Sequence, residues 1–329
     1  MRAWRVHDLG EPVEVLTLDE VPEPTPGPGE VLLAVAGAGL NFPDVLMCRG
    51  EYQLKPALPF TPGAEVAGTV IAVGDGVDSL AVGQRVLAIP KLGTGGLSQQ
   101  TLAAADTAYP IPDGLDWPAA ASVHITYQTG HLALHHRAHL LPGETLLVHA
   151  GAGGVGSAAI QLGRAAGAHV IATAGGPEKT QVCRDIGADL AIDYTADDFV
   201  VAVKDATGGH GADVVYDPVG GDVFDRSRRC VAFEGRILVI GFTSGRIPDA
   251  PANHILIKNY AVVGVHWGLY QIMEPDRTRV THGELMRLHA AGQIAPLVSE
   301  VVGMADAADR VGRLAHRGTW GKVVVDPTR

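Results

Sequence analysis

Short apolar runs alternate with polar and glycine-rich spacers along the chain, and the spacing of these runs changes near residue 124. Before that point, Gly and Pro residues separate the runs Val31–Ala36, Val66–Val73 and Arg85–Ile89, a pattern that predicts a β-rich unit. After it, helical spacers separate the apolar runs, which predicts alternating strands and helices in a doubly wound parallel sheet. The runs expected to form that sheet are Thr145–His149, His169–Thr173, Asp213–Tyr216, Arg236–Ile240 and Ala261–Val265.

The pattern changes once more beyond Trp267. Helical periodicity predicts helices over 281–291 and 306–315, and a final apolar run predicts a last strand over Lys322–Val325. The chain therefore reads as an α/β protein with a β-rich first part and a three-layer second part.

A glycine-rich turn inside the run from Gly143 to Arg164 joins the first strand of the second part to an amphipathic helix. In the arrangement G-x-G-x-x-G the first glycine permits a tight turn, the second lets the backbone approach a pyrophosphate, and the third lets the helix pack on the strand. Free N–H groups at the start of the helix would face the phosphates. The residues expected to bind a dinucleotide here are Gly151, Ala152, Gly153, Gly154, Val155 and Gly156.

A wider set of positions follows a known pattern, namely Gly143, Glu144, Leu147, Gly151, Ala152, Gly153, Gly154, Gly156, Gln161 and Arg164. With these residues the chain resembles the zinc-free quinone oxidoreductases of the medium-chain dehydrogenase/reductase superfamily. The segments Asn41–Asp44, Arg49–Tyr52 and Asp217–Phe224 are also similar in sequence to these enzymes, so the resemblance covers essentially the whole chain. It implies a Rossmann cofactor domain over 124–266, inserted into a GroES-like catalytic domain formed by 1–123 and 267–329, with the active site in the cleft between them.

Composition and charge are those expected of an enzyme from a reducing compartment. The chain has 329 residues, a formal net charge of −11 and no block of Lys and Arg, which disfavours a nucleic-acid surface. No apolar run approaches the roughly 20 residues that span a bilayer, and charged residues interrupt the N-terminus where a signal peptide would be apolar. The three cysteines are far apart in sequence, as expected of free thiols. We expect a cytoplasmic protein.

The sequence after the second strand of the cofactor domain predicts a preference for NADPH (NADP+). An acidic residue at this place would bind the ribose hydroxyls of NAD and repel a 2′-phosphate, but the slot Thr173–Gly176 contains no acid. Gly175 leaves room for a phosphate, and Lys179 follows where a cation can pair with it. The resemblance places Tyr194 against the same phosphate. The alternative interpretation makes Lys179 a solvated helix residue beside Glu178.

Further cofactor contacts follow from topology, because ligands bind at the carboxyl ends of parallel strands. The residues expected there are Val219, Gly241, Phe242 and Val265. The resemblance adds Thr126, which would approach the nicotinamide, and Asn41, which would hydrogen-bond cofactor or substrate. Each has a plainer interpretation: a Thr at this place can cap a helix, and an Asn before a turn can stabilise the local backbone.

No metal site is expected. Where the resembling zinc alcohol dehydrogenases carry their first Cys this chain has Asn41, and where they carry Gly-His-Glu it has Gly63, Ala64 and Glu65. No cysteine lies between Cys48 and Cys183 to supply further ligands. The spacing of His131, His135 and His139 predicts one helical face, which is more typical of solvated or packed histidines than of a metal site.

These features predict direct hydride transfer from NADPH to a small electron acceptor, a quinone or an α,β-unsaturated carbonyl, which can delocalise the arriving charge. The resemblance makes Tyr52 the expected catalytic residue, together with Asn41, because Tyr52 matches a tyrosine that lies near the nicotinamide in quinone oxidoreductases. A phenol with its ordinary pKa of ~10 is protonated at neutral pH and can donate its proton. A packed aromatic at the cleft edge is the alternative role for Tyr52. Asp44 and Arg49 are expected to form an ion pair in the cleft wall.

Two other functions stay open at this point. The first is an enoyl thioester reductase on the same scaffold, which no evident basic pocket for a coenzyme A phosphate supports. The second is a non-enzymatic NADPH-binding sensor or structural protein. In the resembling proteins the last strand of the cofactor sheet pairs with its copy in a second subunit. The apolar segment 259–265 can form such an edge strand, so a homodimer is expected.

Overall fold

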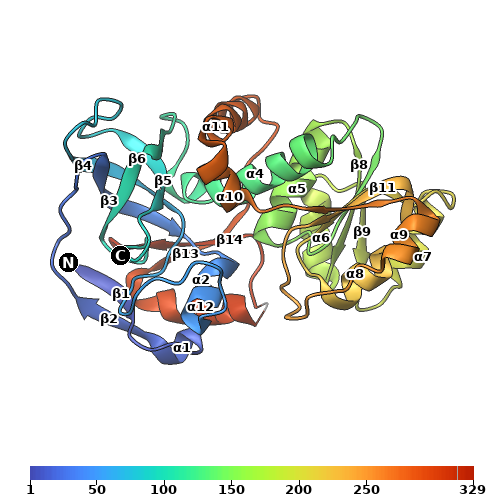
Figure 1. Cartoon of the computed structure of the whole chain (residues 1–329), viewed down its shortest axis with the longest axis horizontal. Coiled ribbons are helices and arrows are strands. Elements are labelled where there is room, and N and C mark those ends of the chain that lie inside the picture. Colours follow the sequence, from blue (N-terminus) through green and yellow to red (C-terminus); the bar gives the residue numbers. More distant parts are fainter. Residues whose placement is uncertain (317) are drawn as a thin grey trace. The chain divides into compact units, whose positions relative to one another are not determined.

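The computed structural model describes residues 1–316 and 318–329, which divide into two compact units (Figure 1). Unit 1 contains residues 1–125 and 296–329, and unit 2 contains residues 126–295. The chain therefore returns to unit 1 after Ala295, whereas the family resemblance implied a return at Trp267.

The segment between Trp267 and Ala295 joins unit 2 through buried hydrogen bonds. Gln128 Nε2 donates to the carbonyl of Thr278 at 2.9 Å, and the Tyr127 hydroxyl donates to the carbonyl of Ala295 at 3.1 Å. Gln161 forms two bonds with the Ala295 peptide, one to its carbonyl at 2.9 Å and one from its N–H at 2.6 Å. These contacts join residues distant in sequence, so the local hydrophobic pattern did not predict them.

Unit 1 is built on a six-stranded sheet in the order β13-β14-β3-β4-β5-β6, in which β3 also pairs with β6. The strands are β3 (Glu30–Gly39), β4 (Val66–Val73), β5 (Arg85–Pro90), β6 (Gln100–Pro110), β13 (Val298–Gly303) and β14 (Lys322–Asp326). A separate hairpin consists of β1 (Arg2–Val6) and β2 (Leu16–Glu20). The helical segments are α1 (Pro12–Val15), α2 (Phe42–Arg49), α3 (Trp117–Ala120), the 3₁₀ turn Met304–Asp306 and α12 (Ala307–Ala315).

The two ends of the chain meet in this sheet. Figure 1 shows β14, in red, beside the blue strands, and β14 pairs antiparallel with the end of β3 at Val324–Gly39 and Val325–Ala38. Gly39 is required here, because a Cβ on it would lie 2.0 Å from the carbonyl oxygen of Ala121. The close approach places Lys322, the first residue of β14, beside the residues that follow β3.

Unit 2 has a six-stranded parallel sheet in the order β12-β11-β10-β7-β8-β9. Its strands are β7 (Thr145–Val148), β8 (His169–Ala174), β9 (Leu190–Asp193), β10 (Ala212–Asp217), β11 (Val231–Val239) and β12 (Ala261–Gly264). All five expected runs are strands. The sixth strand, β9, contains only three apolar residues between Asp189 and Asp193, so its apolar run gave too weak a signal.

Five helices separate these strands along the chain: α5 (Gly154–Ala165), α6 (Pro177–Asp185), α7 (Phe199–Ala206), α8 (Gly221–Ser227) and α9 (Ala252–Lys258). Two more, α10 (Trp267–Met273) and α11 (Pro275–Ala290), follow β12. α4 (His124–His131) precedes them and continues as a π-helix over Leu132–Arg137. The chain leaves β7 toward β8 and returns at β10 on its other side, so the strand order reverses between β7 and β10. Ligands of doubly wound sheets bind at such a switch point.

Each unit has its own apolar core. In unit 2 the core side chains Leu147, Ile171, Val215 and Ile237 are fully buried on neighbouring parallel strands, as expected where helices cover both faces of a sheet.

In the described part of the chain no helix combines the length and the apolar character needed to cross a bilayer.

Candidate functional site

The expected cofactor residues of unit 2 follow the carboxyl ends of its six parallel strands. The glycine turn follows β7, Gly175 follows β8 and Tyr194 follows β9. Val219, Gly241, Phe242 and Val265 follow β10, β11 and β12. Because these ends share one edge of the sheet, the structure brings together residues that are spread over more than a third of the sequence.

The glycine turn is shaped by backbone contacts. Gly151 N donates to the carbonyl of Thr173 at 2.9 Å, which ties the turn to the end of β8. A Cβ on Gly156 would lie 2.2 Å from the carbonyl oxygen of Ala150, so only glycine lets α5 start this close to the turn. Near Gly153, a Cβ would lie 3.2 Å from the Ala150 oxygen, which is a tight contact but less severe than that at Gly156.

A buried histidine that the sequence analysis missed lies at the end of β7, next to this turn. His149 Nδ1 lies 2.9 Å from the Thr173 hydroxyl, and its Nε2 lies 2.8 Å from the Ser227 hydroxyl. Because the Ser227 hydroxyl donates to the carbonyl of Val223, it must accept from Nε2–H, and Nδ1 then accepts from Thr173. Burial lowers the pKa of His149 to about 3, so the ring is neutral and links β7, β8 and α8.

The loop after β8 holds the residues expected to choose the cofactor. Gly175 lies against Tyr194, because a Cβ on this glycine would be 2.8 Å from the tyrosine oxygen. Lys179 lies in the first turn of α6. The carboxylate of Asp193 accepts from Gly176 N at 2.8 Å, and its hydrogen bonds, led by that of Thr195, hold its pKa below the usual value. An acid therefore reaches this loop from β9, although the slot after β8 contains none.

Thr126 and the three expected histidines lie on α4 and beyond it. Thr126 is buried in the first turn of that helix. His131 and His135 have adjacent rings, with centroids 4.5 Å apart. His139 does not continue their face, because the helix widens to a π-helix before it and His139 itself has a φ of 51°. The expected single face of three histidines is therefore wrong.

In unit 1 a buried carboxylate organises the turn after β3. Asp44 Oδ2 accepts from Asn41 N at 2.8 Å, and its Oδ1 accepts from Gly63 N and Ala64 N, each at 3.0 Å. Burial raises the pKa of this carboxyl to about 6. The expected ion pair between Asp44 and Arg49 is wrong, because Arg49 binds Glu11 instead, at 2.8 and 2.9 Å.

Next to Asp44 lies an ion pair that the sequence analysis did not identify. Lys322 Nζ lies 2.9 Å from Glu65 Oε2, and the two side chains are 4% and 0% exposed. The same ammonium donates to the carbonyl of Leu40 at 2.9 Å and to Asn41 Oδ1 at 2.8 Å. Glu65 Oε1 accepts from Ile125 N at 2.9 Å. The pair thus connects four distant segments of unit 1 around Asn41.

Tyr52 lies in the same unit, half-buried against its apolar core. Burial raises the pKa of its phenol, and the negative charge of Asp44 raises it further. The hydroxyl therefore stays protonated throughout the neutral range and is available as a proton donor. The Asp44 carboxylate thus acts on both expected catalytic residues: it accepts the backbone N–H of Asn41, and its charge raises the pKa of Tyr52.

The side chains of this region do not fit a catalytic zinc ion. Asn41 and Ala64 offer no thiolate or imidazole, and the Glu65 carboxylate is already engaged by Lys322. Burial raises the pKa of the nearby Cys48 thiol to about 12, which disfavours the thiolate that zinc binds. Within residues 1–316 and 318–329 no group of three His, Cys, Asp or Glu side chains is arranged to hold a metal ion.

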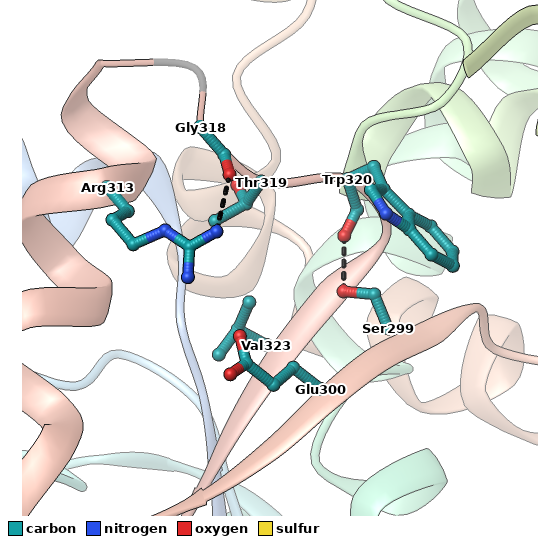
Figure 2. A pocket seen from close by; sticks show the side chains of 7 residues that line it. All are labelled: Ser299, Glu300, Arg313, Gly318, Thr319, Trp320 and Val323. Atoms are coloured by element: carbon teal, nitrogen blue, oxygen red, sulfur yellow. Dashed lines mark hydrogen bonds between the residues drawn. The ribbon is translucent and has the colours of Figure 1, made fainter. Parts of the chain in front are cut away.

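Figure 2 shows a pocket of unit 1 beside the start of β14. It is lined by Ser299, Glu300, Arg313, Gly318, Thr319, Trp320 and Val323. Arg313 donates to the carbonyl of Gly318. The single proton of the Ser299 hydroxyl is donated to the carbonyl of Trp320, and the carbonyl oxygen of Lys322 lies 3.2 Å from the same hydroxyl. None of the expected catalytic or cofactor-binding residues lines this pocket.

Comparisons with known proteins agree with this architecture. Residues 27–113 match the alcohol dehydrogenase GroES-like domain, and residues 154–280 match the zinc-binding dehydrogenase family. The quinone oxidoreductase-like protein 2 homolog of Nematostella vectensis is 38% identical over 327 residues, which cover 99% of this chain and 88% of the relative. The quinone oxidoreductase of Rattus norvegicus is 32% identical over 327 residues, which cover 99% and 97%.

Solved structures give the same result. Escherichia coli quinone oxidoreductase complexed with NADPH is 31% identical, with a TM-score of 0.93 over 99% of this chain and 100% of that one. A mycobacterial protein complexed with NADPH is 33% identical, with a TM-score of 0.92 over 99% and 100% of the two chains.

The three N–H groups on Asp44 lead to a prediction about stability. In Asp44→Asn one carboxylate oxygen becomes an NH₂ group, which then faces a backbone donor instead of accepting from it. We expect the free energy of unfolding to fall by about 2–3 kcal/mol, as for a buried polar group left unpaired. Urea unfolding at neutral pH measures this loss. The control Asp276→Asn removes an exposed acid and is expected to change stability by less than about 0.5 kcal/mol.

Proposed function

Because the chain belongs to the quinone oxidoreductase family of medium-chain dehydrogenases/reductases, we propose that it is a zinc-independent, NADPH-dependent reductase of quinones or α,β-unsaturated carbonyls. The observation that carries this proposal is the pairing of Glu65 with the Lys322 ammonium, which leaves no donor set for zinc, beside a phenol that is protonated at neutral pH. The glycine turn at the switch point of unit 2 supports the choice of a dinucleotide.

The chemistry asks little of the protein beyond alignment and a proton. NADPH, when bound, supplies the hydride. Tyr52 holds a proton at its hydroxyl, which it can donate to the oxygen or carbon of the reduced acceptor. A quinone or enone delocalises the arriving charge, so a phenol is a sufficient acid and no Lewis acid is needed. Asn41, Thr126 and the residues after the six strands of unit 2 are the proposed cofactor contacts.

Steady-state oxidation of NADPH over a panel of quinones, enones and enoyl thioesters, without added metal, tests the proposal. We expect turnover of quinones or enones, and we expect Tyr52→Phe to lower kcat by about 10²-fold because the general acid is lost. Since the pKa of Tyr52 is raised, wild-type kcat is expected to show no alkaline loss below about pH 10.

A matched control separates the hydroxyl from the ring. Tyr109→Phe removes a hydroxyl from another tyrosine of unit 1 and is expected to leave kcat unchanged. Equal kcat in Tyr52→Phe and wild type would restrict Tyr52 to packing. Turnover of enoyl thioesters alone would favour the thioester reductase, and tight NADPH binding without any turnover would favour the sensor.

We expect the enzyme to prefer NADPH to NADH because Lys179 and Tyr194 flank the loop after β8, where a 2′-phosphate would lie. The space beside Gly175 itself is filled by the Tyr194 phenol, so the glycine admits the tyrosine and does not hold open a phosphate site. The ionised Asp193 beside them opposes this preference, so the cation has to outweigh a nearby anion.

Lys179→Met tests this balance. We expect the KM for NADPH to rise about tenfold and the KM for NADH to stay within twofold, because only the 2′-phosphate loses an ionic partner. Lys204→Met, which removes an exposed cation from α7, is the control and is expected to change neither KM. An equal change for both cofactors in Lys179→Met would contradict the assignment.

The remaining proposal concerns assembly and location. β12 is an edge strand, since β11 is its neighbour in the sheet and β12 ends the strand order. Apolar side chains next to it are exposed: Ile257 and Leu256 on α9 are each 75% exposed, and Phe233 on β11 is 68% exposed. Exposed apolar groups beside an open edge are typical of an interface, which supports a homodimer. The cytoplasmic location stays a prediction.

Ile257→Glu tests the dimer. At micromolar concentration we expect wild-type protein to have twice the chain mass of 34.3 kDa, as measured by sedimentation or light scattering. The variant is expected to have the monomer mass, because the dimer would bury a carboxylate at its interface. Val82→Glu introduces the same charge at an exposed position of unit 1 and is expected to leave the mass unchanged. A monomeric wild-type protein would overturn this proposal.

A further inference from the structure

We infer that Lys322 is a positioning residue. Together with Glu65, it fixes the Asn41 carboxamide so that Asn41 can only accept a further hydrogen bond. Asn41 then binds a donor group of NADPH and not the carbonyl oxygen of the electron acceptor. This inference rests on the proposed function and assigns separate tasks to Asn41 and Tyr52.

All hydrogen-bond donors of Asn41 are used inside the protein. Its Nδ2 carries two protons, and both are used: one is donated to the carbonyl of Gly39 at 2.9 Å and one to Glu65 Oε2 at 3.1 Å. Its backbone N–H is donated to Asp44. No donor of Asn41 is left for a ligand, so a quinone or enone oxygen would have to displace a bond inside a buried network.

The neighbours of the Asn41 amide allow it only one orientation. Oδ1 accepts from the Lys322 ammonium at 2.8 Å. If the amide turned over, its NH₂ would face that ammonium, and its oxygen would face the Glu65 carboxylate and the Gly39 carbonyl. Each of the three contacts would become repulsive, so Lys322 and Glu65 act from opposite sides to allow one orientation.

Asn41 Oδ1 keeps capacity for one more hydrogen bond. A carbonyl oxygen can accept two, and Oδ1 accepts one from Lys322; it also faces Asp44 N in the capping box of α2, but without a side-chain cap hydrogen bond. Asn41 is 7% exposed, so only a small part of its surface can meet a ligand. NADPH carries suitable donors in its ribose hydroxyls and in the carboxamide of its nicotinamide, whereas quinones and enones offer oxygen acceptors. Tyr52, which keeps its proton, is the donor that such an acceptor needs.

Burying the charges of Lys322 and Glu65 has a desolvation cost that an apolar pair at the same place would not have. The three protons of the Lys322 ammonium all have acceptors, on Leu40, Asn41 and Glu65, yet burying both charges is no more stabilising than a well-packed apolar pair would be. A buried pair of this kind is better explained by the geometry that it imposes on its neighbour than by stability.

Two variants separate positioning from stability. Lys322→Met leaves Glu65 buried without its partner, but Glu65 still accepts one amide proton of Asn41. In the double variant Lys322→Met with Glu65→Gln, both groups that orient the amide lose their charge, while no lone charge stays buried. The double variant is therefore expected to be the more stable of the two, and to hold Asn41 less firmly.

The measurements are urea unfolding, the equilibrium Kd of NADPH by fluorescence, and the KM of the best quinone or enone. We expect the Kd to rise about tenfold in the double variant, equivalent to about 1.4 kcal/mol, and less in Lys322→Met, while the KM of the acceptor stays within twofold. The double variant is thus expected to be more stable than Lys322→Met but to bind NADPH more weakly. The control Lys91→Met, which breaks an exposed ion pair with Glu30, is expected to leave all three values unchanged.

A second arm identifies the donor on the cofactor. The 3-acetylpyridine analogue of NADPH keeps the ribose hydroxyls but lacks the carboxamide N–H. If the carboxamide is the donor, wild type binds the analogue about tenfold more weakly than NADPH, and the double variant binds it no more weakly than wild type does. If a ribose hydroxyl is the donor, the variant weakens both cofactors equally.

Three results would overturn the inference. A Kd that follows stability, with Lys322→Met the weaker binder, would reduce the pair to a structural role. A raised KM of the acceptor with an unchanged Kd would assign Asn41 to the acceptor, and unchanged values in both variants would remove any role. A wild-type protein that binds NADPH but reduces no acceptor would contradict the proposed function alone, because the Kd series would still test Lys322.

Discussion

The ion pair between Lys322 and Glu65 is the interaction on which the turn around Asn41 in unit 1 depends. It joins the first residue of the last strand to a carboxylate 257 positions earlier, at a place from which both charges are excluded from water. Breaking such a pair costs far more than its net contribution, because the partner left behind stays charged and buried. The end of β3, the turn at Gly63 and the start of α4 therefore have to stay in register for Asn41 to keep its place.

Unit 2 is held by a different constraint, the close approach of its backbone at the switch point. α5 can begin beside β7 only because Gly156 has no side chain, and the neutral His149 fills the space beneath the turn with two satisfied hydrogen bonds. A rigid turn with its polar groups already paired costs little to order when a ligand binds. Unit 2 thus relies on a preorganised backbone, and unit 1 relies on preorganised charge.

The features that the sequence predicted correctly are local ones. A strand, a glycine turn and an amphipathic helix are each encoded within about 20 residues, and the five expected strands of the parallel sheet are present. The errors also have physical causes. Asp44 and Arg49 are five positions apart, which places them about 140° apart around a helix and lets Arg49 reach Glu11 instead. The row of histidines fails at His139 because a π-helix changes the residues per turn.

Lys322 could not have been found from sequence spacing, since nothing near it in the chain marks it as buried. In Lys322–Asp326 it precedes a valine run and looks like the solvated start of an edge strand. Only the antiparallel pairing of β14 with β3 brings its ammonium to Leu40 and Asn41. Charge in a protein interior acts through such long-range pairing, because the low dielectric makes an unpaired group intolerable. A residue that orients another side chain, as we infer for Lys322 and the Asn41 amide, can therefore lie in a segment without any recognisable sequence motif.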